Sequence, residues 1–207
     1  MIKICGLKTE DEIKWTAGAG ADLGGVVVFF PKSKRNMDIM EAGQLVKYAH
    51  ESGLKMAAVT VSPELSDVRM IEEAGFDFAQ IHGEISAEIL TETSIPIIKA
   101  FNVRDLGEYD KYKDDPRVAG FVFDAAIPGS GIMFDHSVLS NVSFDLCSGK
   151  FMLLAGGLNP GNVRNALESS GIKGADTSSG VENENGTGKS REKIYSFVSE
   201  AKKALQS

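Results

Sequence analysis

Short apolar runs alternate with amphipathic stretches along the whole chain, and eight such runs can be counted. Most are continuously apolar rather than alternating between apolar and polar residues, which is the pattern of parallel strands buried on both faces. The strand candidates are residues 2–5, 24–30, 55–61, 78–82, 96–101, 119–124, 151–157 and 174–179. The last of these, "GADTSS", has poor strand propensity, and only the rhythm of the other seven predicts a strand there.

Helix signals fall between these runs. Thr9 followed by Glu12 is a capping-box pattern that opens a first helix. Ser62-Pro63 and Asn159-Pro160 each predict a capping side chain followed by a proline at the first helical position. The segments after residues 96–101 and 119–124 predict weaker helices. A stripe at helical spacing predicts the apolar face of a terminal helix, formed by Ile194, Phe197, Val198, Ala201 and Leu205.

Eight strand-then-helix units follow one another without a linker, a low-complexity tract or a break in composition. This organisation predicts an α/β fold in which residues 1–207 form a single-domain (β/α)8 TIM barrel. A doubly wound open sheet is the alternative arrangement of the same elements.

The barrel prediction also ranks the polar residues, because side chains at the carboxyl ends of the strands face the active site. Cys5, Arg35, His82, Asp124 and Asp176 all lie at or just after such strand ends. A thiol near cationic groups can ionise and act as a base, and a carboxyl group can act as the matching acid. A guanidinium can form a two-point pair with a substrate carboxylate. The set is a coherent inventory for proton-transfer chemistry on an anionic substrate.

Each of these residues also has a purely structural interpretation. Cys5 can be a small core residue, since free cysteine packs well. Asp124 can cap a turn, and Arg35 can belong to a solvated basic loop, "PKSKR". His82 can be a rim histidine that donates a single hydrogen bond. All of these residues are predicted to lie at the same end of the barrel, and this shared position favours a catalytic role over a structural one.

Two glycine-bearing stretches, "LAGGLNPGNV" and "SSGVENENGTG", predict a phosphate site. Gly156 and Gly157 let backbone N–H groups approach a ligand closely, because no Cβ intervenes. Ser178, Ser179 and Gly180 offer hydroxyl and backbone donors from the next loop, where a short helix would aim its N-terminus at an anion. Barrels commonly bind phosphate with these two loops. The alternative is that the glycines are turn residues.

The stretch "GTGKS" at residues 186–190 resembles part of a P-loop, but the P-loop pattern needs a glycine where Asn183 stands. We therefore expect a solvated connection there.

Composition narrows the function further. A formal net charge of −7 argues against a nucleic-acid partner. Neither an apolar run long enough for a membrane span nor a signal-peptide pattern is present, so no membrane partner is expected. With two cysteines, Cys5 and Cys147, a reducing cytoplasm is the expected location. Three histidines do not form a metal-ligating cluster, and no dinucleotide fingerprint follows the first strand.

With these residues in place, the chain resembles the phosphoribosylanthranilate isomerase family of tryptophan biosynthesis over its full length. The resemblance is carried by "KICGL", "FFPKSKR", "QIHG", the strand-end Asp124, "FD" at residues 134–135, "LAGGLNPGNV" and "DTSSGVE". It implies a (β/α)8 barrel without a cofactor. The implied reaction is an Amadori rearrangement of N-(5'-phosphoribosyl)anthranilate to the 1-deoxyribulose 5-phosphate product. The sixth loop, "PGSGIMFDH", is shorter than the family's usual version, which leaves room for an altered substrate preference.

By the same resemblance, Cys5 matches the general base and Asp124 the general acid, and Arg35 matches the residue that holds the anthranilate carboxylate. The loops with Gly156-Gly157 and Ser178-Ser179-Gly180 match the phosphate grip. Asp176 matches an aspartate at the same mouth, and His82 is a further substrate-binding candidate. The partner is then a small phosphoribosyl compound. A monomer is expected, with a homodimer as the alternative.

Two other functions stay open at this point. The first is another phosphosugar barrel enzyme. A metal-dependent epimerase would need a cluster of metal ligands, which this sequence does not show. The related histidine-pathway isomerase resembles this chain but has an aspartate at the position of Cys5, so Cys5 argues against it. A non-catalytic barrel that binds a phosphorylated metabolite is the second, and the presence of both Cys5 and Asp124 argues against it.

Overall fold

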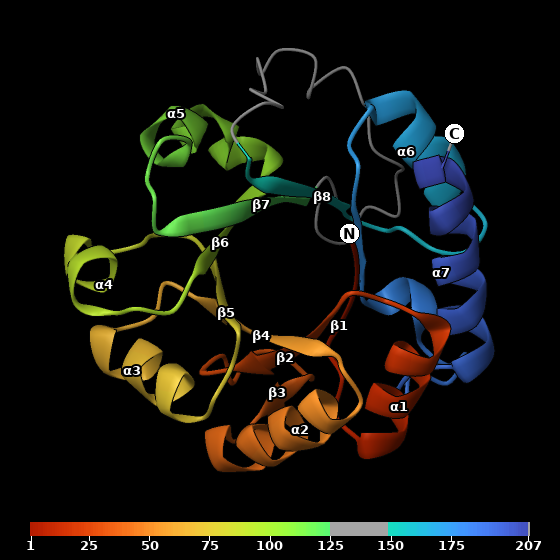
Figure 1. Cartoon of the computed structure of the whole chain (residues 1–207), viewed down its shortest axis with the longest axis horizontal. Coiled ribbons are helices and arrows are strands. Elements are labelled where there is room, and N and C mark those ends of the chain that lie inside the picture. The colour runs from red at the N-terminus through yellow and green to blue at the C-terminus, as the bar shows by residue number, and fades with distance from the viewer. Residues whose placement is uncertain (125–148, 207) are drawn as a thin grey trace.

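Eight parallel strands close into a barrel in the computed structural model, which describes residues 1–124 and 149–206 (Figure 1). Around the barrel the order is β1 (Ile2–Cys5), β9 (Ala175–Thr177), β8 (Phe151–Ala155), β7 (Val118–Asp124), β6 (Ile97–Asn102), β5 (Phe78–His82), β4 (Lys55–Val61) and β2 (Leu23–Val28). Pairing of β1 with β2 closes the ring. A two-residue strand, β3 (Asn36–Met37), adds to the end of β2. The predicted fold class is confirmed, including the strand that rested on rhythm alone.

Helices surround the barrel on the outside (Figure 1). They are α1 (Glu10–Ala19), α2 (Ile39–Glu51), α3 (Leu65–Glu73), α4 (Ala87–Glu92), α5 (Tyr109–Tyr112), α6 (Val163–Ser170) and α7 (Arg191–Gln206), with 3-10 turns η1 (Val103–Glu108) and η3 (Ser179–Val181). The weak helix expected after β6 is a 3-10 turn followed by the short α5. The weak helix expected after β7, the "FD" motif and Cys147 lie outside the described residues.

The barrel has two apolar layers, because successive strand residues point to opposite faces. The larger layer lies between strands and helices. The smaller lies inside the barrel, formed by Leu23, Ala57, Ile98, Ala100, Val122, Leu153 and Ala155. On α7 the predicted apolar stripe packs on the outer layer, with four of its five residues buried and Leu205 partly buried.

The alternation in β7 directs its final carboxylate. Phe121 and Phe123 belong to the outer layer, where both stack on Phe101 with ring centroids 6.0 and 5.9 Å apart. Such pairs add about 0.5–1.5 kcal/mol beyond the burial of their area. Val122 faces the barrel interior, so Asp124, two residues further on, lies on the same inner side at the carboxyl end of the strand.

Of the three helix starts predicted from capping residues, the structure shows one at the predicted position. Thr9 caps α1, and its hydroxyl accepts from the backbone N–H of Glu12 at 3.2 Å. The prediction at Ser62-Pro63 was wrong: Ser62 has a φ of 44°, its hydroxyl accepts from the N–H of Glu84, and Glu64 is the residue before α3. The hydroxyl is used to tie two strand-end loops together instead of capping the helix.

The prediction at Asn159-Pro160 placed the helix start too early. The Asn159 side chain accepts from the N–H of Gly161 at 2.8 Å and closes a turn. Its carbonyl then accepts from the N–H groups of Asn162 and Val163, and α6 begins at Val163. The asparagine thus stabilises the turn that leads into the helix.

No helix in the described part of the chain is long and apolar enough to cross a membrane.

Candidate active site

A cavity lies at the carboxyl ends of the strands, where the barrel rule places an active site. Nine of the ten predicted site residues line it: Cys5, Arg35, His82, Asp124, Gly156, Gly157, Asp176, Ser178 and Ser179. Gln80 and Thr177 also contribute to its wall. The fold thus brings together side chains that are as far apart in sequence as β1 and β9.

Cys5 ends β1 with its side chain on the same face as Lys3, two residues before it. Both side chains lie against Gly25 of β2, the residue paired with Cys5. A Cβ at Gly25 would lie 3.1 Å from the Cys5 sulfur and 3.2 Å from the Lys3 ammonium nitrogen. Because Gly25 has no side chain, the Cys5 thiol and the Lys3 ammonium can both pack against it.

Lys3 is fully buried and forms an ion pair with Asp176 across β1 and β9. Its Nζ donates to both carboxylate oxygens at 3.0 Å. Burial alone would lower the pKa of Lys3, but the carboxylate of Asp176 and the sulfur of Cys5 outweigh it, so the pKa lies above its usual value. Lys3 therefore carries a positive charge at neutral pH, next to Cys5.

Asp124 ends β7 and is half-buried at the cavity wall. Strands β8 and β9 separate it from Cys5 on β1. The carboxyl group and the thiol thus come from different strands and face one cavity, as an acid and a base acting on one small molecule would.

His82 ends β5 and lies beside Gln80, with the two side-chain Nε2 atoms 3.2 Å apart. Burial lowers the pKa of His82 to about 4, and the charges of Lys3 and Lys99 add to the effect. The imidazole is therefore neutral at physiological pH and can accept the amide hydrogen of Gln80. The Gln80 Oε1 atom is buried and has no hydrogen-bond partner among the described residues, and Gln80 contributes to the cavity wall.

Arg35 reaches the cavity from the loop after β2, across the residue that follows Cys5. A Cβ at Gly6, where φ is +75°, would lie 2.5 Å from the Arg35 Cδ and 3.0 Å from the Ser178 hydroxyl. The glycine of "KICG" is therefore needed for close packing as well as for its backbone conformation. It lets Arg35 pass directly over the rim beside Cys5.

The two predicted phosphate loops follow β8 and β9, and both line the cavity. Gly156 and Gly157 follow β8 with φ angles of 95° and 69°, in the left-handed region that favours glycine. Ser178 follows β9, and its hydroxyl donates to the carbonyl of Cys5 at 3.0 Å. The loop after β9 is thus tied directly to the end of β1.

Gly180 is the one predicted site residue that does not line this cavity. A Cβ there would lie 1.9 Å from the carbonyl oxygen of Leu158, so the glycine allows the loops after β8 and β9 to touch. Gly180 instead borders a surface hollow of about 600 Å³ on the outer side of these loops, together with Pro160 and Asn183.

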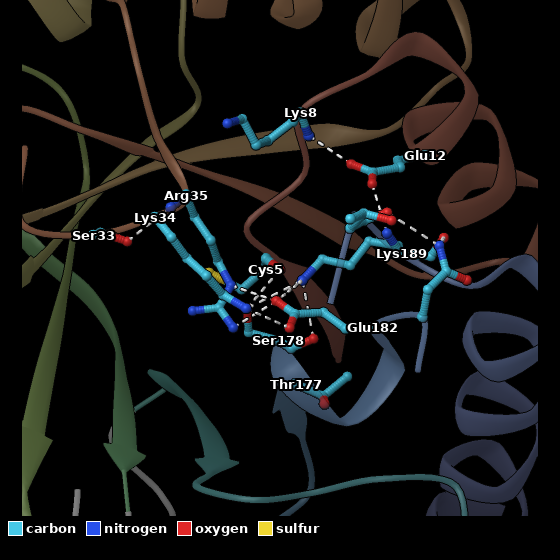
Figure 2. Close-up of polar contacts among 12 residues, drawn as sticks. Cys5, Lys8, Glu12, Ser33, Lys34, Arg35, Thr177, Ser178, Glu182 and Lys189 are labelled. Carbon is cyan, nitrogen blue, oxygen red and sulfur yellow. Dashed lines mark hydrogen bonds and ion pairs between the residues drawn. The ribbon is translucent and has the colours of Figure 1, made fainter. Parts of the chain in front are cut away.

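Three charged residues of this region were missed by sequence reasoning. Lys3 could have been found, because its alternation with Cys5 places both on the inner face of β1. Lys189 could not: residues 183–188 of the same loop are exposed as expected, yet Lys189 is 3% exposed. Its Nζ donates to the carbonyl and hydroxyl of Ser178 at 2.9 and 3.2 Å (Figure 2). Glu182 is the third, and its carboxylate pairs with Arg35.

The buried Glu12 explains why the end of this loop folds inward. Its carboxylate accepts from the backbone N–H of Lys8 at 2.6 Å and from that of Lys189 at 2.7 Å (Figure 2). A capping-box glutamate would return to its own N-cap residue. Here it fixes the backbone of Lys189 to the start of α1 instead, and this directs the lysine side chain toward Ser178.

Among the described residues, no group of three or more histidine, cysteine, aspartate or glutamate side chains is placed to hold a metal ion.

A parallel barrel with a thiol, a carboxyl group and glycine loops at its carboxyl mouth is typical of barrel enzymes that act on small anionic molecules. Comparison with known proteins assigns the family. The model of the family described as "N-(5'phosphoribosyl)anthranilate (PRA) isomerase" matches residues 2–200. The chain belongs to this family.

Individual relatives agree with that assignment. An N-(5'-phosphoribosyl)anthranilate isomerase from Streptococcus mutans is 36% identical over 203 residues, which is 98% of each chain. A structure of monomers of the dimeric phosphoribosylanthranilate isomerase from Thermotoga maritima is 27% identical, with a TM-score of 0.79 over 98% of each chain. A phosphoribosylanthranilate isomerase in complex with reduced 1-(o-carboxyphenylamino)-1-deoxyribulose 5-phosphate is 27% identical, with a TM-score of 0.80 over 98% of each chain.

Proposed function

We propose that this chain catalyses the Amadori rearrangement of N-(5'-phosphoribosyl)anthranilate to 1-(2-carboxyphenylamino)-1-deoxyribulose 5-phosphate, a step of tryptophan biosynthesis. The family match over residues 2–200 carries the activity. The observation that supports the chemistry is that Cys5 and Asp124, from β1 and β7, line one cavity.

Asp124 is the general acid in this proposal. It donates a proton to the ring oxygen of the ribose as the bond between that oxygen and C1' breaks, and the nitrogen lone pair forms an iminium at C1'. The leaving oxygen would otherwise carry a negative charge, so its protonation lowers the barrier to ring opening. Asp124 becomes a carboxylate in this step.

Cys5 is the general base. Its thiolate removes the proton from C2', whose acidity is raised by the neighbouring iminium, and the electron pair forms the enolamine. Protonation at C1' and loss of the proton from the C2' hydroxyl then give the ketone. The ammonium of Lys3 lies beside the sulfur and interacts favourably with its charged form. Asp176 supports this arrangement by holding Lys3 in place.

The remaining cavity residues bind the two anionic ends of the substrate. Arg35 pairs with the anthranilate carboxylate, and the loops with Gly156-Gly157 and Ser178-Ser179 surround the phosphate, while Gly180 lets these two loops touch. Neutral His82 lines the same cavity and can hydrogen-bond a hydroxyl group of the sugar. No cofactor takes part in the proposed reaction.

The proposal extends to the state of the whole protein. Residues 1–207 act as one barrel domain that works as a monomer in the cytoplasm, with neither a nucleic acid nor a membrane as partner. A homodimer is the alternative, and the Thermotoga maritima relative is described as dimeric. Sedimentation of the purified chain decides between the two.

The function is tested by adding purified protein to freshly generated N-(5'-phosphoribosyl)anthranilate and following the fluorescence of the anthranilate group. We expect the fluorescence to change with a rate proportional to protein concentration, and mass spectrometry to find a product isomeric with the substrate. Unchanged fluorescence would overturn the isomerase assignment. Turnover of the histidine-pathway aldose instead would favour the competing barrel isomerase.

A further inference from the structure

The carboxylate of Glu182 faces three basic side chains, those of Lys34, Arg35 and Lys189, close to the cavity (Figure 2). Lys34 Nζ lies 3.0 Å from it, and Arg35 donates from Nε at 2.7 Å and lies 2.5 Å away through Nη2. Lys189 Nζ lies 3.7 Å away. Burial would raise the pKa of Glu182, but hydrogen bonds from Lys34 and Arg35 outweigh it, and the pKa lies below its usual value. Glu182 is therefore ionised at neutral pH.

The backbone of Glu182 is anchored on the loop between η3 and α7. Its N–H donates to the carbonyl of Ser179 at 3.1 Å, and its own carbonyl accepts from Lys193 Nζ at 3.0 Å. It also forms an isolated antiparallel bridge with Lys189. The Glu182 side chain is 12% exposed, so its carboxylate is held in place rather than free in solvent.

The contacts with Arg35 use one edge of the guanidinium. Both Nε and Nη2 bond the same oxygen, Oε1, of Glu182. A guanidinium is planar and carries further N–H groups on Nη1 and Nη2, so this pairing leaves its other edge for a second carboxylate. Arg35 lines the cavity, whereas Glu182 does not appear in its wall. Glu182 thus contacts Arg35 from outside the wall of the cavity.

The local charge balance allows a second carboxylate to bind. One negative charge on Glu182 is set against the positive charges of Lys34 and Arg35, and Lys189, whose pKa is lowered by burial, is a third basic group beside it. A net positive charge therefore remains at this rim when Glu182 is ionised. The ion pair orders Arg35 before substrate arrives, and ordering a long side chain in advance lowers the cost of binding.

We propose that Glu182 is a positioning residue that holds the guanidinium of Arg35 in place for the aromatic carboxylate of the substrate. The inference rests on the proposed function, because it takes Arg35 as the carboxylate-binding group. Under this proposal, Glu182 helps the protein to select substrates that carry this carboxylate. The competing interpretation is that Glu182 is an internal competitor that substrate must displace from Arg35.

The test compares two ligands in binding experiments that need no turnover. One is reduced 1-(o-carboxyphenylamino)-1-deoxyribulose 5-phosphate, and the other is the same compound with a phenyl group that lacks the carboxylate. Titration calorimetry gives both dissociation constants for the wild type, Glu182→Ala and Glu182→Gln. Glu184→Ala is the matched control, because Glu184 is exposed on the same loop.

We expect Glu182→Ala to weaken binding of the carboxylate ligand about tenfold, as for the loss of a charged hydrogen bond, and to leave the phenyl ligand within about twofold. Glu182→Gln keeps the shape and a neutral acceptor and should fall between Ala and wild type. Glu184→Ala should match wild type. Thermal unfolding of each variant checks that it is folded.

Equal weakening of both ligands would overturn the proposal and make Glu182 a general structural residue, and so would unchanged binding. Tighter binding of the carboxylate ligand by Glu182→Ala would establish competition instead. A wild type that binds the carboxylate ligand selectively but does not turn over the substrate would overturn the proposed function while leaving the role of Glu182 intact. If Glu182→Ala does not fold, Glu182→Gln decides the question through the same comparison of dissociation constants for the carboxylate ligand and the phenyl ligand.

Discussion

Protonation of His82 at acid pH should destabilise the folded protein by a predictable amount. Its pKa falls from 6.5 to about 4 in the folded state, chiefly because burial penalises the charged imidazole. Between these two values the unfolded chain binds a proton that the folded chain does not. The stability is therefore unaffected above pH 6.5 and falls as the pH drops toward 4. At about 1.4 kcal/mol per pKa unit, the loss approaches about 3 kcal/mol.

The assay is urea unfolding followed by circular dichroism at a series of pH values, for wild type and His82→Gln. Other groups also titrate in this range, so the informative quantity is the difference in unfolding free energy between the two proteins. We expect this difference to shift by about 3 kcal/mol in favour of the variant between pH 7 and pH 4. Loss of the contact with Gln80 adds an offset that does not vary with pH.

His50→Gln is the control, because His50 is an exposed histidine on α2 that pairs with Asp77. It should not reproduce the gain at acid pH. A difference between wild type and His82→Gln that stays constant from pH 7 to pH 4 would refute the reasoning. His82 would then be able to accept a proton in the folded state, and its proposed role as a neutral ligand to the sugar would fail.

Three further predictions concern the charges and close contacts around the cavity. Asp176→Asn leaves the buried Lys3 ammonium without its carboxylate partner, so we expect the free energy of unfolding in chemical denaturation to fall by about 3–5 kcal/mol. The double variant Lys3→Met with Asp176→Leu removes both charges and should recover most of that loss. Equal stability of Asp176→Asn and wild type would contradict the ion pair. Lys189→Met removes the hydrogen bonds from Lys189 Nζ to the carbonyl and hydroxyl of Ser178 and should lower the free energy of unfolding by about 1–3 kcal/mol in urea denaturation; equal stability of the variant and wild type would contradict a structural role for these bonds. Gly180→Ala should lower stability by about 2 kcal/mol or more, because its Cβ would lie 1.9 Å from the Leu158 carbonyl; a neutral effect on the unfolding midpoint would show that the loops after β8 and β9 can move apart.

The sequence predicts the barrel well because the strand-then-helix pattern is repeated along the whole chain. Residues 174–179 have poor strand propensity, yet Ala175–Thr177 pairs with β1 and β8 because the seven other units leave this gap in the ring. Local signals did worse where a side chain has a distant partner. Ser62 has the composition of a helix cap, but its hydroxyl binds a residue 22 positions away.

The site divides in a similar way. Cys5 and Asp124 follow from their place at strand ends, a position that the barrel rule interprets directly. Lys189 and Glu182 lie in or next to an exposed, glycine-rich loop, and their partners Ser178 and Arg35 come close only in the folded chain. Nothing in the local sequence separates a buried lysine from its solvated neighbours. Their roles depend on tertiary contacts that periodicity does not encode.

The central claim is that Cys5 and Asp124 act as base and acid on one sugar. It is tested most directly by single-turnover fluorescence of N-(5'-phosphoribosyl)anthranilate with wild type, Cys5→Ser and Asp124→Asn at equal concentrations. Because each group transfers a proton in the reaction, we expect each substitution to slow the chemical step by about 10²-fold or more, with binding of the product analogue retained. Full turnover by Asp124→Asn or by Cys5→Ser would contradict the mechanism.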